Sequence, residues 1–231
     1  MEISVHGDGD DREPVLVVLG WGNHPGQANV AWLIDGLVAA GREVHAATLP
    51  TNASSFERAY MRPLASYVAD RTFDAVVAHS LGGLVTATLD WDVRRVYLSP
   101  WWGVREGVQS AVFRALAALP TSRPLVPAAG SVGDISEPTP RETTRLSPTF
   151  VREVRRAQAS LPAFRPDSTV FCSLTDAIVS VAAIGERTPA ANLRVYDGGH
   201  EFFSSTGRAA VLDDVVAALR DGPAAVAGAS T

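Results

Sequence analysis

The chain alternates short apolar runs with longer stretches in which apolar and polar residues recur at helical spacing. Short apolar runs of this kind predict β-strands, and the helical spacing predicts amphipathic helices. The expected strands cover residues 2–6, 14–19, 43–48, 73–79, 94–98, 168–174 and 192–196. The expected helices cover residues 28–40, 55–71, 81–89, 178–186 and 206–220. This alternation favours an α/β fold, in which helices cover both faces of a mostly parallel sheet.

The alternation stops between Trp101 and Pro166, in a stretch that is rich in proline and carries two helical patterns. The first pattern has four apolar residues on one face: Val108, Val112, Leu116 and Leu119. The second begins after Ser147, with Pro148 in its first turn, and has three: Val151, Val154 and Leu161. We therefore expect residues 1–100 and 166–231 to form the core domain. Residues 101–165 are expected to form a helical cap or lid over the carboxyl ends of the strands, where open α/β sheets bind ligands.

One predicted strand runs through a serine directly into a predicted helix, in the sequence Val-Val-Ala-His-Ser-Leu-Gly-Gly-Leu-Val of residues 76–85. This pattern indicates a nucleophile elbow, a tight turn that lifts the Ser80 hydroxyl clear of the sheet edge. The small residues Ala78 and Gly82 leave room for the strand and helix backbones to approach each other. The G-x-S-x-G pattern has glycine where this chain has Ala78, so the motif is matched incompletely. Ser80 is the candidate nucleophile.

Two further polar residues follow later strands in an order that fits Ser80. Asp176 comes after the predicted strand 168–174, and His200 comes after the predicted strand 192–196. The order serine, acid, histidine and the elbow motif resemble the α/β-hydrolase family, and the resemblance covers nearly the whole chain. It implies a catalytic triad of Ser80, Asp176 and His200. Asp197 is the alternative acid, but it lies so near His200 in sequence that its side chain would have to double back to reach the ring.

These residue types suit acyl transfer because a serine hydroxyl is a poor nucleophile near neutral pH. His200 would remove the Ser80 proton during attack and return it to the leaving group. Asp176 would fix the tautomer of the imidazole and stabilise the imidazolium ion that forms. The acid itself does not take the proton.

An oxyanion hole is the remaining requirement, and two backbone amides are sufficient for it. The resemblance implies Leu81, which follows the nucleophile, and Trp21, which follows the strand over residues 14–19. Family members commonly read His-Gly-x in this loop, and the amide of x is the donor. Here the sequence is Leu19-Gly20-Trp21, so the usual histidine is missing. We expect Asn23 or His24 to fasten the loop instead.

Composition narrows the range of functions. With 231 residues, of which 46% are hydrophobic, the chain can bury one full core. Its modest net charge of -5 argues against a nucleic-acid partner. All 20 basic residues are arginine, which excludes lysine Schiff-base chemistry. We expect no cofactor and no metal site.

We expect no targeting segment and no membrane span. Cys172 is the single cysteine, the amino terminus lacks a signal pattern, and no stretch is long and apolar enough to span a membrane. These features favour a cytoplasmic protein. The small, alanine-rich tail over residues 222–231 is expected to be frayed.

The expected function is a serine hydrolase that cleaves a carboxylic ester or thioester of a small to medium apolar acyl group. Four residues of the insertion are candidates for the substrate pocket: Trp101, Trp102, Val112 and Leu116. A C–C bond hydrolase or a cofactor-free perhydrolase could use the same triad. A binding protein or receptor that keeps the fold without turnover is a further alternative. The sequence leaves the oligomeric state open.

Overall fold

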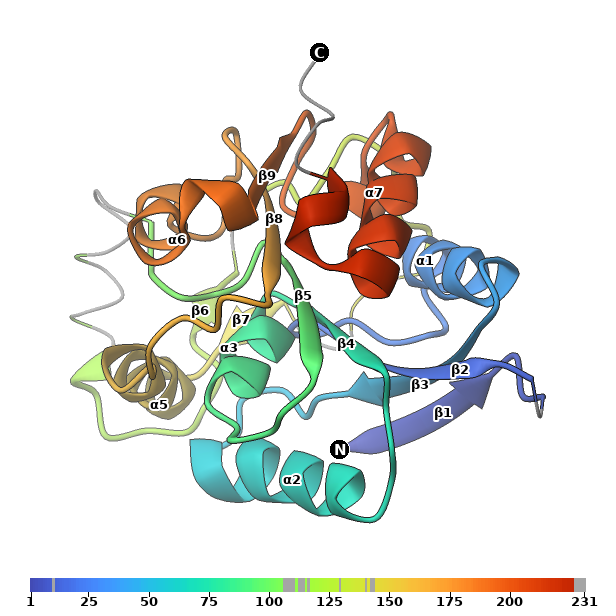
Figure 1. Ribbon diagram of the computed structural model, residues 1–231. Coiled ribbons are helices and arrows are strands. Elements are labelled where there is room, and N and C mark those ends of the chain that lie inside the picture. Colours follow the sequence, from blue (N-terminus) through green and yellow to red (C-terminus); the bar gives the residue numbers. More distant parts are fainter. Residues whose placement is uncertain are drawn as a thin grey trace.

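Figure 1 shows the computed structural model of the protein, which describes residues 1–9, 11–105, 111, 115, 117–128, 130–139, 141 and 144–226, with Val126 described by its backbone alone. The main strands are β1 Glu2–His6, β2 Glu13–Val18, β3 Arg42–Thr48, β4 Ala75–His79, β5 Arg94–Leu98, β8 Thr169–Ser173 and β9 Leu193–Tyr196. The α-helices are α1 Ala28–Ala39, α2 Arg62–Ala69, α3 Leu81–Ala87, α5 Pro148–Ala159, α6 Val181–Arg187 and α7 Arg208–Asp221. A π-helical turn, η1 Glu57–Met61, precedes α2, and the described residues also include the 3₁₀ turns η2 Ala190–Asn192, η3 Phe202–Ser204 and η4 Pro223–Val226.

The seven main strands form one sheet in the order β1-β3-β2-β4-β5-β8-β9. Every neighbouring pair is parallel except β1 and β3, which run antiparallel at one edge. Each strand that the sequence predicted is present, with ends that differ by at most two residues from those expected. The predicted mostly parallel α/β architecture is therefore confirmed.

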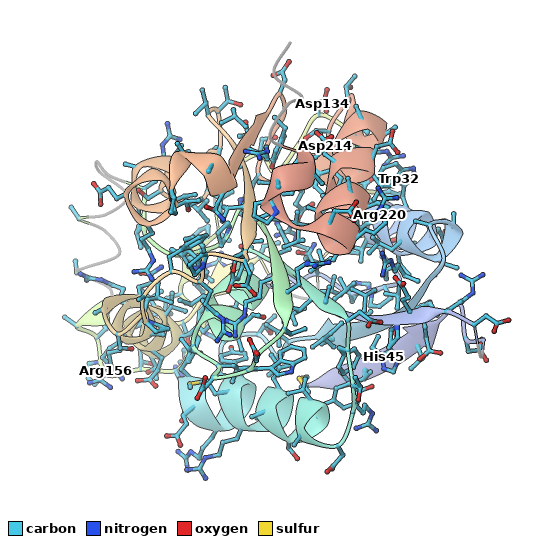
Figure 2. All side chains as sticks on the ribbon, viewed as in Figure 1. Trp32, His45, Asp134, Arg156, Asp214 and Arg220 are labelled. Atoms are coloured by element: carbon cyan, nitrogen blue, oxygen red, sulfur yellow. The ribbon has the colours of Figure 1, made fainter. Side chains whose placement is uncertain are left out.

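Helices cover both faces of this sheet (Figure 1). Along β2 the side chains alternate, so that Leu16 and Val18 pack into one apolar layer while Val15 and Val17 pack into the other. The first layer is completed by α2, α3, α5 and α6, and the second by α1 and α7. Charged side chains on the outer surfaces, such as Arg156 on α5 and Arg220 on α7, point to solvent (Figure 2).

The helix α5 within the insertion begins as the sequence predicted. The Ser147 hydroxyl accepts a hydrogen bond from the Phe150 amide at 3.2 Å, and Pro148 occupies the first turn. Phe150, Val151 and Val154 are buried against the core. A short ribbon of β6 (Val126–Pro127) and β7 (Arg145–Leu146), which the sequence did not predict, precedes this helix.

The other helical pattern of the insertion is seen only at its end. Val108, Val112 and Leu116 lie outside the described residues, and Leu119, expected on an apolar face, is exposed.

The expectation of a frayed tail is wrong for residues 223–226, which form η4 and bury Val226 against the layer of α7. Among the described residues, no helix combines the length and the apolar character needed to cross a membrane.

Helix α3 approaches the sheet so closely that only glycine fits at one position. A Cβ atom on Gly82 would lie 2.1 Å from the Val18 carbonyl oxygen of β2. This contact is with backbone, which cannot move aside as a flexible side chain could. Because Gly82 has no side chain, α3 and the preceding Ser80 can lie close to the sheet.

We predict that Gly82→Ala lowers the free energy of unfolding by at least about 2 kcal/mol, because the added methyl forces α3 away from β2. Gly185 in α6 is the matched control, since a Cβ there meets nothing within 4 Å. Gly185→Ala is expected to raise stability by about 0.5–1 kcal/mol through helix propensity. Urea unfolding of the two variants measures both effects, and equal stabilities would contradict the close packing of α3.

Candidate active site

Ser80 lies in a strained turn between β4 and α3. Its backbone has φ 50° and ψ -113°, a conformation that residues with a side chain rarely adopt. Neighbouring backbone holds it there, because the Ser80 amide donates to the Leu98 carbonyl at 3.0 Å and the Ser80 carbonyl accepts from the Trp101 amide at 2.9 Å. Strained backbone of this kind persists where the surroundings determine it, and it often marks functional sites.

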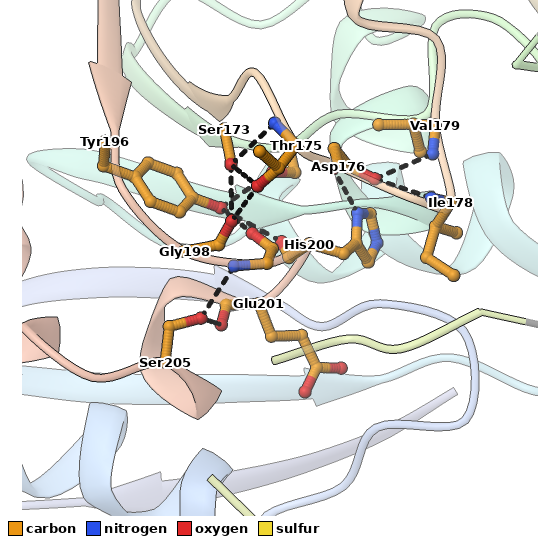
Figure 3. Close-up of polar contacts among 12 residues, drawn as sticks. Ser173, Thr175, Asp176, Ile178, Val179, Tyr196, Gly198, His200, Glu201 and Ser205 are labelled. Atoms are coloured by element: carbon orange, nitrogen blue, oxygen red, sulfur yellow. Dashed lines mark hydrogen bonds and ion pairs between the residues drawn. The ribbon is translucent and has the colours of Figure 1, made fainter. Parts of the chain in front are cut away.

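Asp176 and His200 meet after β8 and β9, at the end of the sheet where β4 delivers Ser80. The Asp176 Oδ2 atom lies 2.8 Å from His200 Nδ1, and its Oδ1 atom accepts from the amides of Ile178 at 2.7 Å and Val179 at 3.0 Å (Figure 3). Both side chains are buried. An ionised carboxylate can only accept, so Nδ1 is the donor in this hydrogen bond, and in a neutral imidazole Nε2 would then be the acceptor.

The surroundings of Asp176 keep its carboxyl group ionised. Burial alone would raise its pKa, but the hydrogen bond and charge of His200 and the amides of Val179 and Ile178 outweigh burial and lower the pKa below its usual value. Asp197, the alternative acid, is exposed at the surface. The structure therefore joins His200 to Asp176 and not to Asp197.

Side chains from the neighbouring elements fix the loop that carries His200. The hydroxyls of Ser173 and Thr175, which end and follow β8, both donate to the Gly198 carbonyl (Figure 3). The Ser205 hydroxyl accepts from the Gly199 amide at 2.9 Å. Sequence reasoning missed these polar residues, for which the only local signal is the pair of glycines before the histidine.

His79, next to the candidate nucleophile, lies against the candidate base. Its ring centroid is 4.9 Å from that of His200 and 5.1 Å from that of Phe203. Burial, together with the charges of His200 and Arg141, lowers the pKa of His79 well below its ordinary value. His79 is therefore a neutral packing residue behind the site, as its position beside the elbow favours.

The turn after β2 presents the Trp21 amide. The Asn23 amide donates to the Gly20 carbonyl at 3.1 Å, and Gly22 takes φ 73° inside this turn. In the described part of the chain, no hydrogen-bond acceptor is found for the amide of Trp21 or of Leu81. Leu81 is the first residue of α3, where helix amides have no partner within the helix. Both amides therefore remain candidates for the oxyanion hole.

The candidate pocket residues differ in their surroundings. Trp101 and Trp102 are both buried, so neither is a freely exposed aromatic residue. The Trp101 ring lies 6.1 Å from Phe150 of α5, whereas Trp102 packs edge-on against Tyr97 and lines a cavity of about 300 Å³ beside α3. The other two candidates, Val112 and Leu116, lie outside the described residues.

The lowered pKa of His79 predicts a pH effect on stability. In the unfolded state His79 binds a proton near pH 6.5, whereas in the folded state it stays neutral at that pH. The free energy of unfolding therefore falls as the pH drops below 6.5. We expect His79→Gln to reduce this pH slope, to which one such group contributes at most about 1.4 kcal/mol per pH unit. Urea unfolding of both proteins at pH 7.5 and 5.5 measures the difference, and identical slopes would rule out a buried neutral His79.

Solved structures of lipolytic enzymes are similar to this chain, although no family model and no curated protein sequence matches it. A monoacylglycerol lipase from Paleococcus ferrophilus aligns with 94% of this chain and 99% of its own, with TM-score 0.71 and 19% identity. A soluble variant of the monoglyceride lipase from Saccharomyces cerevisiae aligns with 95% of this chain and 91% of its own, with TM-score 0.72 and 14% identity. A metagenome-derived lipolytic enzyme aligns with 91% of this chain and 94% of its own, with TM-score 0.71 and 17% identity. Identities this low bear on architecture alone, and by that architecture the chain has the α/β-hydrolase fold.

Proposed function

We propose that the protein is a serine hydrolase that cleaves a carboxylic ester or thioester through an acyl-enzyme intermediate. The observation that carries the proposal is the buried hydrogen bond between Asp176 and His200, at the sheet edge that also carries the strained Ser80. A protein that only binds its ligand has no need of an ionised carboxylate held against an imidazole. The lipases among the similar structures support ester chemistry as the substrate class.

In the first half of the proposed reaction, Ser80 Oγ attacks the carbonyl carbon while His200 Nε2 takes the hydroxyl proton. Asp176 remains ionised and stabilises the imidazolium ion. The carbonyl oxygen becomes an oxyanion, which accepts hydrogen bonds from the amides of Trp21 and Leu81. The tetrahedral intermediate then collapses, and His200 returns the proton to the departing alcohol or thiol.

In the second half, a water molecule takes the place of the leaving group. His200 removes a proton from this water as it attacks the Ser80 ester, and the same two amides bind the second oxyanion. Collapse releases the carboxylic acid and returns the proton to Ser80. The Asp176–His200 pair therefore acts twice in each turnover.

We assign the acyl group to a small or medium apolar chain held beneath the insertion. Trp101 lies three residues after the end of β5, its amide donates to the Ser80 carbonyl, and its ring lies beside Phe150 of α5. An aromatic residue tied to the nucleophile in this way is suited to an apolar substrate wall. In this proposal residues 101–165 act as the cap.

The experiment is ester turnover by Ser80→Ala. A panel of p-nitrophenyl esters of graded chain length is assayed with parent and variant, and thermal unfolding shows that both are folded. We expect turnover to fall by at least about 10⁴-fold, because removal of a triad member leaves only the catalysis of the oxyanion hole and binding. Turnover by the variant within tenfold of the parent would overturn the assignment of Ser80.

A further inference from the structure

The residue after His200 is a buried carboxylate with partners from three segments. Glu201 is 3% exposed. Its Oε1 atom accepts from Asn23 Nδ2 at 3.0 Å and pairs with the Arg141 guanidinium, and its Oε2 atom accepts from the Ser204 hydroxyl at 2.7 Å. A buried charge is tolerated only when it is paired and hydrogen-bonded, so these partners are needed to keep Glu201 in place.

Asn23 links this carboxylate to the turn that presents the Trp21 amide. Its own backbone amide closes that turn on Gly20, and its side chain is the donor to Glu201. The turn has little space to shift, because a Cβ atom on Gly20 would lie 2.5 Å from His79 Nδ1 and 2.7 Å from Asn23 Oδ1. The Asn23 side chain therefore lies close against Gly20, and the placement of the one depends on the placement of the other.

The Arg141 side chain lies beside the same turn. Its Cδ atom lies 3.5 Å from the position that a Cβ atom would take on Gly22, the residue after Trp21. The arginine stem therefore covers the turn while its guanidinium pairs with Glu201. Arg141 belongs to the insertion, whereas Glu201 and the turn belong to the core.

The segment that leads to Arg141 is fastened to the loop after His200. The Glu201 amide donates to the Val132 carbonyl at 2.7 Å, and the Ile135 amide donates to the Ser204 carbonyl at 2.9 Å. The Glu137 carboxylate accepts from the first two amides of α1, at 3.1 and 2.8 Å, where the helix dipole favours negative charge. Arg141 is therefore held at a defined place beside the core.

We infer that Arg141 and Glu201 are positioning residues for the oxyanion hole: the insertion holds, through Glu201 and Asn23, the turn that aims the Trp21 amide. This inference rests on the proposed function and adds to it a task for the insertion besides covering the substrate. Asn23 replaces the histidine that is missing from the loop. The buried Glu201 carboxylate gives the Asn23 side chain a fixed hydrogen-bond acceptor.

The test compares Arg141→Met, Asn23→Leu and the double variant. Methionine keeps most of the stem that covers Gly22 and removes the charge. Arg165→Met is the matched control, because the Arg165 side chain is 32% exposed against 26% for Arg141 and also pairs with a carboxylate, that of Asp92. Arg165 and Asp92 precede β8 and β5, at the amino ends of the strands, whereas the candidate site lies at the carboxyl ends. For each protein, kcat and KM are measured with a p-nitrophenyl ester, together with inhibition by a trifluoromethyl ketone, which forms a tetrahedral oxyanion on the serine.

We expect each single variant to lose about tenfold to a hundredfold in kcat, a part of the loss caused by removing an oxyanion donor, with KM within about threefold of the parent. Ketone affinity should fall in parallel with kcat. Both residues act through one turn, so their effects should not multiply. The kcat of the double variant should be about equal to that of the less active single variant. Arg165→Met should stay within about twofold of the parent.

Two outcomes would overturn the inference: multiplicative losses in the double variant, or kcat within about threefold of the parent in Arg141→Met. If Arg141→Met does not fold, Asn23→Leu decides alone, since it leaves the ion pair intact, and kcat within about threefold of the parent would overturn the inference.

Hydrogen exchange of the Asn23 backbone amide separates this inference from the proposed function. If the parent hydrolyses no ester, the proposed function fails, but the exchange rate still reports on the turn. Faster exchange in Arg141→Met than in Arg165→Met supports the positioning role. Equal exchange rates overturn it.

Discussion

The hydrogen bond between Asp176 and His200 constrains everything around it, because it requires an ionised carboxylate to remain in the protein interior. Desolvation opposes this charge, and the fold offsets the cost with the amides of Ile178 and Val179 as well as with the imidazole. The loop after β9 must in turn hold the His200 ring within hydrogen-bond distance of Asp176. The hydroxyls of Ser173 and Ser205 hold that loop by its backbone.

The parallel sheet places these candidate residues at the same end of its strands, although they lie far apart in sequence. Parallel strands present their carboxyl ends at one edge, and β2, β4, β8 and β9 are followed there by Trp21, Ser80, Asp176 and His200. The close approach of α3 to β2 at Gly82 sets the elbow near the turn of the candidate oxyanion donor. The geometry of the site is thus a consequence of strand order and of one glycine.

The strands could be predicted because their apolar runs are short, continuous and bounded by turn residues, and the start of α5 could be predicted from Ser147 and Pro148. The pairing of His200 with Asp176 was implied by the resemblance to the α/β-hydrolase family, and the structure has this hydrogen bond. Glu201 and Arg141 could not be found in this way, because 60 residues separate them and neither has a local motif. The burial of Val226 was missed for a similar reason, since only tertiary packing distinguishes it from a frayed tail.

In the proposed mechanism Asp176 activates Ser80 through His200, and a matched pair of isosteric variants tests this role. Asp176→Asn and Asp197→Asn each remove one carboxylate near the base, and the rates of ester turnover and of fluorophosphonate labelling are measured for both. We expect Asp176→Asn to lose about 10⁴-fold in kcat and to be labelled slowly, while Asp197→Asn stays within a few-fold of the parent. The reverse order, or equal losses in the two variants, would contradict it.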